Sequence, residues 1–368
     1  MIGVLGGYGA IGLETVRFLN GFRSDVCVLG RDPNRAECCL AQANLTNRVS
    51  IVQMDIRDES RLAAFAKTAD ILVNCTGPSH DYSAVCARLA ARQACHYIDL
   101  GMIGEADELE IAEWQPDCAI VHAAGMSQGL SGLLQRHILR DLEAVDLTYC
   151  FGGISAYTQT AADDFVHGMN RRQHQSMVCW QDGALRRCGL RPVDTGGLFD
   201  GETAFYPFFD EESDHMVRHY DIRRGLWCFA VEGTAFNCVI KRMRYMYQAD
   251  PNRTIQAVVD ASVADQSAWG ECIKFYLSAC VPDGRQRQLT LSAPSQAGLS
   301  AAVVAETVRA VLNGQIENGV CRLAAVSDER PIVEKLAAYP FIRLHESARG
   351  VLPDRCSIPD VEEGVLDL

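Results

Sequence analysis

Residues 1–19 constrain the fold of this chain more than any other stretch. Residues 2–5 form an apolar run of strand length, and residues 7–12 match the pattern G-x-G-x-x-G. Apolar residues then recur at Leu13, Val16 and Leu19, which is the spacing of one helical face. A strand, a glycine turn and a helix in this order predict a dinucleotide-binding site. Its expected residues are Gly7, Tyr8, Gly9, Ala10, Ile11 and Gly12.

The three glycines of the pattern have separate expected roles. Gly7 should permit a tight turn out of the strand, Gly9 should let the backbone approach a phosphate, and Gly12 should let the helix pack closely. The helix should begin near Ala10, with its unpaired N–H groups and the positive end of its dipole facing the phosphate. This attraction is local and does not depend on the net charge of the protein.

Apolar strands and amphipathic helices alternate as far as residue 122, at the spacing of parallel βα units. The expected strands cover residues 2–5, 25–29, 49–53, 70–75, 96–100 and 118–122. The expected helices between them cover residues 10–19, 33–43, 59–67, 82–92 and 105–114. The predicted fold class is α/β, and residues 1–125 are expected to form a Rossmann domain on a doubly wound parallel sheet.

Residues 126–368 are expected to form a second, α+β domain on a mostly antiparallel sheet. Helices are expected over 130–142 and 161–172, a strand over 145–151, a hairpin at Asp182-Gly183, an aromatic loop over 205–209, and long antiparallel strands over 226–247 and 271–291. Such strands need a covering layer or a partner, which favours a homodimer. The prediction allows a C-terminal segment to pack back on the first domain.

The charge balance limits the possible partners. The 368 residues carry 34 Lys and Arg against 47 Asp and Glu, whereas nucleic acid or an anionic membrane surface would require a basic field. Residues 118–135 and 288–305 are uncharged, but they are too rich in Gly, Ser and Gln to span a bilayer. Because an apolar strand starts at Ile2, we expect no cleaved signal peptide and a cytoplasmic location.

The cysteines and histidines do not follow a metal-binding pattern. The 16 cysteines are scattered without a C-x-x-C pair, and we interpret them as reduced apolar side chains rather than as metal ligands or disulfides. His215 and His219 have i, i+4 spacing, and His167 and His174 precede them, but no third ligand of matching pattern follows. We therefore predict no metal site.

The end of the second strand bears on the choice of nicotinamide cofactor. NAD enzymes usually place Asp or Glu there to accept from the ribose 2′-OH, but here the strand ends in Gly30-Arg31. A glycine clears space and a guanidinium pairs with a 2′-phosphate, which favours NADP(H), although Asp32 could serve NAD. Asp55, after the third strand, either contacts the adenine end of the cofactor or caps the following helix.

Four segments resemble the saccharopine dehydrogenase-like reductase family, which includes saccharopine reductases and carboxynorspermidine dehydrogenases. They are residues 5–12, 74–78 (Asn-Cys-Thr-Gly-Pro), 96–101 (His-Tyr-Ile-Asp-Leu-Gly) and 124–131 (Ala-Gly-Met-Ser-Gln-Gly-Leu-Ser). A weaker match follows at residues 181–183 and 298–302. The resemblance implies hydride transfer between NADP(H) and a carbon–nitrogen bond of an amino-acid-like or imine substrate. It also implies that the second domain binds substrate and mediates dimerisation through an open sheet.

One departure from the family concerns the substrate. Members that act on amino acids resemble Asp-Pro-Gly where this chain has Ser127-Gln128-Gly129. The loss of a carboxylate near the substrate amine argues against a saccharopine-like substrate. A different imine, for example on a carrier-tethered biosynthetic intermediate, has equal weight.

The reacting centre is expected in the loops after the fourth, fifth and sixth strands, because open α/β sheets bind ligands at their carboxyl ends. Thr76, Gly77 and Pro78 would pass under the nicotinamide and leave one face of its ring open to substrate. Pro78 would fix the turn.

The candidate catalytic residues are Asp99, His80 and Tyr97. Asp99 would stabilise a cationic iminium, and His80, Tyr82 or Tyr97 would relay a proton. Each has a structural alternative: Asp99 could cap the glycine loop at Gly101, and His80 could be an ordinary residue at a helix start.

Three functions are consistent with these patterns. The first is an NADP(H)-dependent dehydrogenase or reductase acting on a C=N or C–NH centre. The second is a reductase of a carrier-bound thiazoline or similar cyclic imine. The third is a dinucleotide-binding scaffold or sensor without turnover, which the missing Asp-Pro-Gly carboxylate and the lack of a compelling acid leave open.

Overall fold

The computed structural model describes residues 1–22, 24–45, 49–170 and 174–349. This part of the chain forms two compact units. The first contains residues 1–133 and 296–339, and the second contains residues 134–295 with the described residues from 340 onward. The expected boundary at residue 125 lies close to the first break, whereas residues 296–339 return to the first unit.

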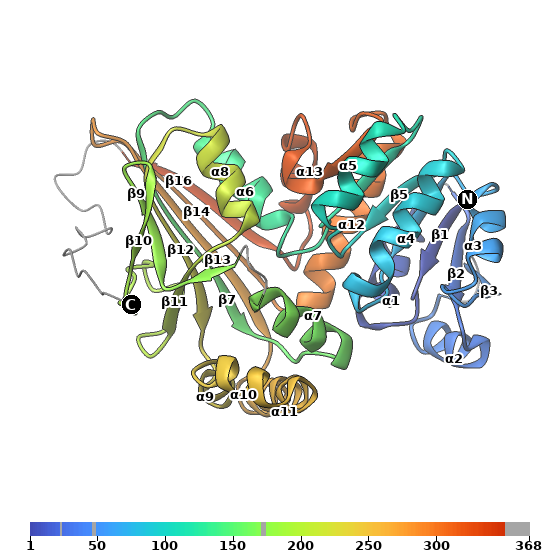
Figure 1. Cartoon of the computed structure of the whole chain (residues 1–368), viewed down its shortest axis with the longest axis horizontal. Helices are drawn as coiled ribbons and strands as arrows, with labels where there is room; N and C mark the ends of the chain where they lie inside the picture. The colour runs from blue at the N-terminus through green and yellow to red at the C-terminus, as the bar shows by residue number, and fades with distance from the viewer. Residues whose placement is uncertain (23, 46–48, 171–173, 350–368) are drawn as a thin grey trace. The chain divides into compact units, whose positions relative to one another are not determined.

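The first unit is built on a parallel sheet whose described strands follow the order β15-β6-β5-β4-β1-β2-β3. They are β1 (Ile2–Leu5), β2 (Val26–Gly30), β3 (Val49–Gln53), β4 (Ile71–Asn74), β5 (His96–Asp99), β6 (Ala119–His122) and β15 (Gly319–Arg322). Figure 1 labels β1, β2, β3 and β5 of this sheet. β1 pairs with both β2 and β4, so the winding reverses there. Doubly wound sheets bind dinucleotides at such a switch point. The predicted Rossmann sheet is confirmed, and β15 extends it.

Helices accompany this sheet in the expected alternation. They are α1 (Ala10–Leu19), α2 (Pro33–Gln42), α3 (Glu59–Ala66), α4 (Ser79–Arg92), α5 (Glu105–Glu113), α12 (Gln296–Leu312) and α13 (Arg330–Leu336), with a 3₁₀ turn at Leu323–Ala325. α12 packs against α1 and β5, and its residues from Gly298 to Val308 are all buried. The stretch from Gly298 to Ala305 carries no charged side chain, and a helix that is apolar on every face is buried on every side.

The second unit contains a mixed, mostly antiparallel sheet, as predicted. Its described strands are β7 (Val145–Ile154), β8 (Gln175–Ser176), β9 (Val178–Gln181), β10 (Ala184–Arg187), β11 (Ala204–Phe209), β12 (Ile222–Val231), β13 (Cys272–Cys280), β14 (Gln286–Ala293) and β16 (Arg343–Arg349). The main order is β10-β9-β12-β7-β13-β14-β16, with β11 on β12 and β8 on β11. β7 pairs in parallel with β12 and antiparallel with β13.

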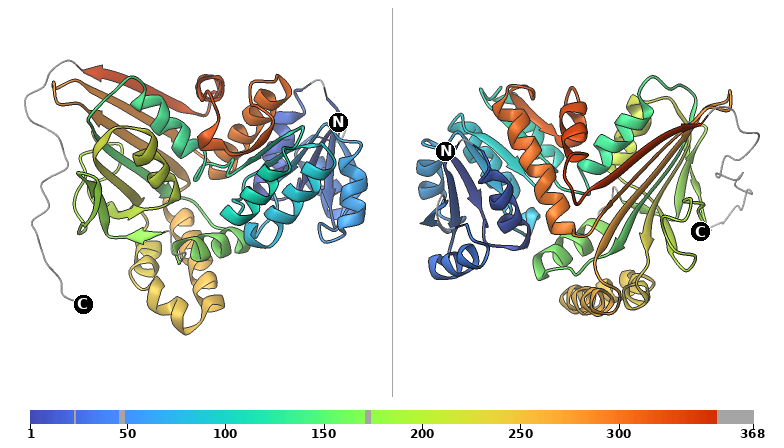
Figure 2. Two further views of the ribbon diagram at one scale, coloured as in Figure 1. Left: turned by 45° about the horizontal axis from the view of Figure 1, so that its top comes forward. Right: turned by 180° about the vertical axis from the view of Figure 1, so that it is seen from behind.

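The helices of the second unit include a group at one end of its sheet. The described helices of this unit are α6 (Leu130–Leu139), α7 (Gln159–Met169), α8 (Glu211–His219), α9 (Thr234–Ile240), α10 (Met243–Ala249) and α11 (Pro251–Trp269). α6 begins at the break between the units. α9, α10 and α11 gather at one end of the strands (Figure 2). The end of the predicted helix over 161–172 lies outside the described residues.

Two predicted elements of the second half are wrong. Residues 205–209 form β11 rather than a loop, because their aromatic rings pack on the sheet: Phe208 lies 6.0 Å from Phe151 between ring centroids. The predicted strand over 226–247 stops at Val231, and α9 and α10 follow. Asp265 of α11 accepts from the Ala235 and Phe236 N–H groups at 3.0 and 2.7 Å. A residue that is distant in the sequence therefore provides the hydrogen-bond acceptors for the first N–H groups of α9.

Phe275, at the centre of β13, is fully buried and stacks on Phe151 with 6.0 Å between ring centroids. We expect Phe275→Ala to lower the free energy of unfolding by about 3–5 kcal/mol, because it leaves a cavity in this aromatic core. Trp269→Ala is the control, since that ring is 71% exposed and its loss should change stability by about 0.5 kcal/mol or less. Urea unfolding followed by circular dichroism measures both, and equal effects would contradict this packing.

Candidate cofactor site

The glycine turn joins β1 to α1 at the switch point of the sheet. Gly6 has a φ of +69°, in the region that favours glycine, so the tight turn lies at Gly6 rather than at Gly7 as predicted. Gly7 instead lies against β2, where an added Cβ would come within 3.0 Å of a Val28 methyl group. Close packing on β2 therefore explains Gly7.

The turn fills the space beside Gly12 but leaves Gly9 open. A Cβ on Gly12 would lie 2.1 Å from the Gly6 carbonyl oxygen, whereas on Gly9 the one described atom within 4 Å would be that same oxygen, at 3.2 Å. Gly9 is the N-cap of α1, and none of the described side chains caps this helix. The first N–H groups of α1 therefore lack partners within the helix. These residues fit a pyrophosphate, because an uncapped helix start binds anions.

The sequence analysis expects Gly30 to clear space for the 2′-phosphate of the cofactor. In the structure the Tyr8 side chain occupies this space. A Cβ on Gly30 would lie 2.1 Å from the Tyr8 ring, so Gly30 makes room for this side chain. The Tyr8 hydroxyl accepts from the Asp32 N–H at 3.2 Å, and the Arg35 guanidinium lies 5.8 Å from the centre of the Tyr8 ring. Arg31 is exposed. Asp32 caps α2 by accepting from the Arg35 N–H at 3.0 Å.

Asp55, beyond β3, forms an ion pair with Arg57. Two guanidinium nitrogens of Arg57 lie 3.0 and 2.7 Å from the Asp55 carboxylate oxygens, and these hydrogen bonds hold the pKa of Asp55 well below its usual range. Asp58 caps α3 instead, accepting from the Arg61 N–H at 3.1 Å. The expectation that Asp55 caps this helix is therefore wrong, and its contact with the adenine end stays a prediction.

Asn74, the last residue of β4, holds the loop that follows. Its amide oxygen accepts from the Thr76 N–H at 3.0 Å and from the Thr76 hydroxyl at 2.5 Å, while its amide nitrogen donates to Asp99 at 2.9 Å. These bonds fix the path of Thr76 and Gly77, and Pro78 precedes α4 as its N-cap. Sequence reasoning missed the role of Asn74, although a polar residue ending an apolar strand was the available signal.

Asp99 and Tyr97 are fully buried at the end of β5. The Asp99 carboxyl group accepts from the Tyr97 hydroxyl, the Asn74 amide and the Gly101 N–H, the last at 2.7 Å. Burial raises the pKa of Asp99, although these hydrogen bonds oppose the shift, and burial also raises the pKa of Tyr97. The hydrogen bond from the Gly101 N–H matches the structural alternative to catalysis for Asp99, which is to cap the glycine loop. Both side chains hold loops rather than line an open surface.

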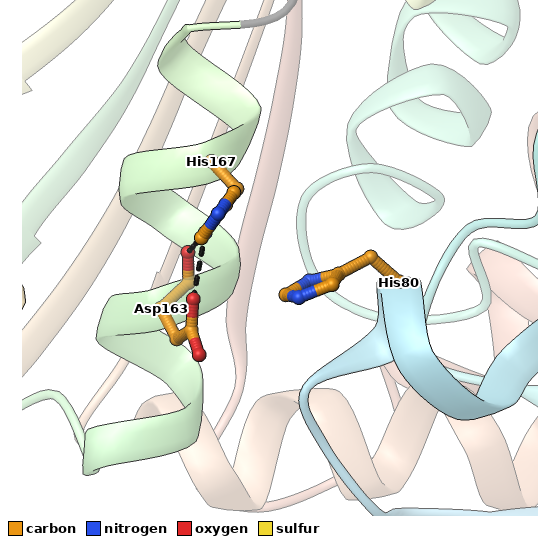
Figure 3. Close-up of side chains that lie close together, drawn as sticks. All are labelled: His80, Asp163 and His167. Atoms are coloured by element: carbon orange, nitrogen blue, oxygen red, sulfur yellow. Dashed lines mark hydrogen bonds and ion pairs between the residues drawn. The ribbon is translucent and has the colours of Figure 1, made fainter. Parts of the chain in front are cut away.

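His80 lies in the first turn of α4 and is exposed (Figure 3). Its Nε2 atom is 3.6 Å from a carboxylate oxygen of Asp81. Among the three candidate catalytic residues, His80 is thus the one with an accessible side chain. Its place at the start of α4 also matches the alternative from the sequence analysis, in which His80 is an ordinary residue at a helix start.

His167, His215 and His219 make contacts within their own helices of the second unit. Nδ1 of His167 lies 2.6 Å from a carboxylate oxygen of Asp163, one turn earlier on α7 (Figure 3). On α8, the His215 and His219 rings stack with 4.0 Å between centroids, and Nδ1 of His219 lies 2.8 Å from the His215 carbonyl oxygen. The i, i+4 spacing of each pair is thus explained by contacts along one helix.

A partly buried polar cluster that the sequence did not indicate lies at the ends of β6 and β15. His122 is fully buried, and its Nε2 atom lies 3.3 Å from a carboxylate oxygen of Glu108 on α5. Nε of Arg322 lies 3.4 Å from the same oxygen. Burial alone would raise the pKa of Glu108, but His122 and Arg322 lower it below its usual value. The cluster ties α5 to two strands.

Comparison with known proteins agrees with this geometry. Residues 2–121 match the family described as saccharopine dehydrogenase NADP binding domain. These residues belong to that family. No curated protein matches the chain.

Solved structures resemble the chain at low sequence identity. Apo saccharopine dehydrogenase (L-Glu forming) from Saccharomyces cerevisiae is 13% identical with a TM-score of 0.67, and the match covers 95% of this chain and 99% of that one. The dehydrogenase MviM from Clostridium difficile is 8% identical with a TM-score of 0.43, covering 91% and 95% of the two chains. The first similarity shows that the fold extends beyond the NADP binding domain into the second unit.

The NADP binding domain assigns an NAD(P) dinucleotide to the first unit, of the kind used by saccharopine dehydrogenase-like oxidoreductases. The predicted residues of its glycine turn, together with Arg31, Asp55 and Thr76, follow the ends of β1 to β4 along one edge of the sheet. None of the described helices has the length and apolar character needed to cross a bilayer.

The Glu108 cluster predicts a pH dependence for the NADP binding domain. Because the folded-state pKa of Glu108 is lowered, its stabilisation should be complete above the unfolded pKa, about 4.3, and should disappear as the pH falls through the folded value. The difference in unfolding free energy between wild type and Glu108→Gln should therefore be largest near neutral pH and shrink below about pH 4. Urea unfolding across this range measures the difference, and a pH-independent value would contradict the assignment.

Proposed function

We propose that the protein is an NADP(H)-dependent oxidoreductase that transfers hydride to or from a C=N or C–NH centre. The observation that carries this proposal is the uncapped start of α1 beside Gly9, in a domain of a family described as NADP-binding. The cofactor supplies the hydride when bound. The chain contributes the anion site, the orientation of the cofactor and the loops at the carboxyl edge.

NADP(H) is favoured over NAD(H) by the arrangement at the end of β2. Asp32 is engaged in capping α2 and therefore competes poorly for a ribose hydroxyl. Arg31, next to it, is exposed and follows the strand directly. A guanidinium at this position would pair with a 2′-phosphate through charge-assisted hydrogen bonds.

The proposed roles at the reacting centre differ in kind. Thr76, Gly77 and Pro78 would pass under the nicotinamide on the path that Asn74 fixes. Asp99 and Tyr97 act as positioning residues, since both are fully buried. His80 remains the candidate for a proton relay because its ring is exposed and because an imidazole ring can both accept and donate a proton.

For the substrate we propose an amino-acid-like compound or another imine, with a carrier-tethered cyclic imine of the thiazoline type as the second candidate. The exposed Ser127, where an amino-acid-specific relative would carry Asp, supports the second candidate. A homodimer assembled through the second unit is proposed with it, because β16 leaves one sheet edge unpaired among the described strands.

A direct test follows NADPH absorbance in the presence of 2-oxo acids with amines and of cyclic imines. Wild type should consume NADPH with at least one of these substrates. Gly9→Val should bind NADPH at least about 100-fold more weakly and show no turnover, because its side chain would occupy the phosphate space, with the Gly6 carbonyl oxygen, at 3.2 Å, as the one described atom within 4 Å of the added Cβ.

Gly104→Val is the matched control. Gly104 is also a glycine N-cap without a side-chain partner, in front of α5, and an added Cβ would meet nothing closer than Asp107 at 3.5 Å. It should retain NADPH affinity. Tight NADPH binding without consumption by any substrate would favour the scaffold function, and unchanged NADPH affinity in Gly9→Val would refute the anion site.

The cofactor preference has its own test in Arg31→Ala. This variant should bind NADPH about 10- to 100-fold more weakly, the loss of one charge-assisted contact, while its affinity for NADH stays within about twofold. Titration of both nucleotides by fluorescence gives the two constants. Equal affinity of the wild type for NADPH and NADH would overturn the preference.

A further inference from the structure

Four cysteines that are far apart in the sequence gather in one buried cluster of the second unit. They are Cys150 on β7, Cys179 on β9, Cys188 just after β10 and Cys228 on β12, and they pack with Phe199, Phe205 and Tyr276. All four are free thiols. The proposed hydride transfer uses none of them, so the cluster requires a separate explanation.

Cys179 and Cys188 lie side by side on the β9–β10 hairpin, which is labelled in Figure 1. Cys179 is the register partner of Arg186, and the Cys188 N–H donates to the Met177 carbonyl at 2.9 Å, so the pairing continues past β10. Residues opposite one another on antiparallel strands point to the same face, as do residues two apart on one strand. The two cysteines are therefore diagonal neighbours on one face of the hairpin, and both pack in the same buried cluster.

The surroundings distinguish the two sulfur atoms. The neighbouring Cys179 thiol and the Arg191 guanidinium lower the pKa of Cys188, against the effect of burial. The same contact raises the pKa of Cys179. One member of the pair is thus disposed to be a thiolate and the other a thiol, which is the arrangement of a nucleophilic and a resolving cysteine.

The neighbouring pair, Cys150 and Cys228, provides a contrast. These residues are direct register partners on β7 and β12 and are fully buried. Burial raises the pKa of Cys228 well above its ordinary value. A thiol with a raised pKa and no exposed surface is inert toward oxidants, whereas Cys188 keeps 4% of its surface exposed and has a lowered pKa.

We propose that Cys179 and Cys188 form a reversible disulfide when the protein meets a peroxide. The Cys188 thiolate attacks hydrogen peroxide: an S–O bond forms, the O–O bond breaks and hydroxide leaves, giving a sulfenic acid. The Cys179 thiol then attacks this sulfur, forming the S–S bond and releasing water. Two electrons pass from the two sulfur atoms to one peroxide, and a dithiol reductant restores both thiols.

The experiment treats the full chain with hydrogen peroxide, blocks the remaining thiols with N-ethylmaleimide and maps the peptides by mass spectrometry. We expect a cross-linked peptide that joins Cys179 to Cys188, lighter by two hydrogen atoms than the separate peptides, and its loss after dithiothreitol. Cys188→Ser and Cys179→Ser should each abolish it, whereas Cys150→Ser and Cys228→Ser should retain it.

The wild-type peptide map decides the proposal even if a variant folds poorly, because it requires no substitution. Recovery of Cys179 and Cys188 as separate maleimide adducts after peroxide treatment would overturn the proposal. So would a disulfide that joins Cys150 to Cys228 instead. NADPH affinity is not part of this readout, so the result is independent of the proposed function.

Discussion

The close contact between the Gly6 carbonyl and Gly12 is the constraint on which the first unit depends. It lets α1 begin directly at the turn that leaves β1, with an approach that even one methyl group would prevent. Because β1 lies between β2 and β4, the uncapped helix start is placed where the sheet reverses its winding. The proposed anion site is therefore a product of backbone packing, and no charged side chain is needed to create it.

Two carboxyl groups hold the carboxyl edge of the same sheet: Asp99, which is fully buried, and Glu108, which is half-buried. The pKa of the first is raised and that of the second is lowered. Asp99 accepts three hydrogen bonds, yet burial raises its pKa, so the unit bears a cost whenever this group is ionised. Glu108 is flanked by a histidine and an arginine that outweigh its burial, so its charge is stabilised. Each carboxyl group connects elements that are distant in sequence. Both keep the loops that would surround a cofactor on fixed paths.

The part of the first unit from β1 to β6 followed from the sequence because its local signals agree, whereas the return of residues 296–339 to this unit did not. The strands from β1 to β6 are short apolar runs bounded by turn residues, and the glycine pattern lies between a strand and a helix. The features that escaped prediction depend on contacts across the chain. Tyr8 fills the space at Gly30, and Asp265 satisfies the start of α9 from another helix. The cysteine cluster likewise required the register of β7, β9 and β12, which spacing alone does not give.

The enclosure of Asp99 and Tyr97 has a consequence for the proposed chemistry. An iminium carbon already bears the positive charge that attracts a hydride, and hydride addition yields a neutral amine without a further proton. A dedicated acid is then needed only to form the iminium, a step that solvent or the exposed His80 can serve. What the transfer itself requires is a fixed distance between two carbon atoms. Residues that hold loops in place, as Asn74 and Asp99 do here, meet this requirement from outside the reacting centre.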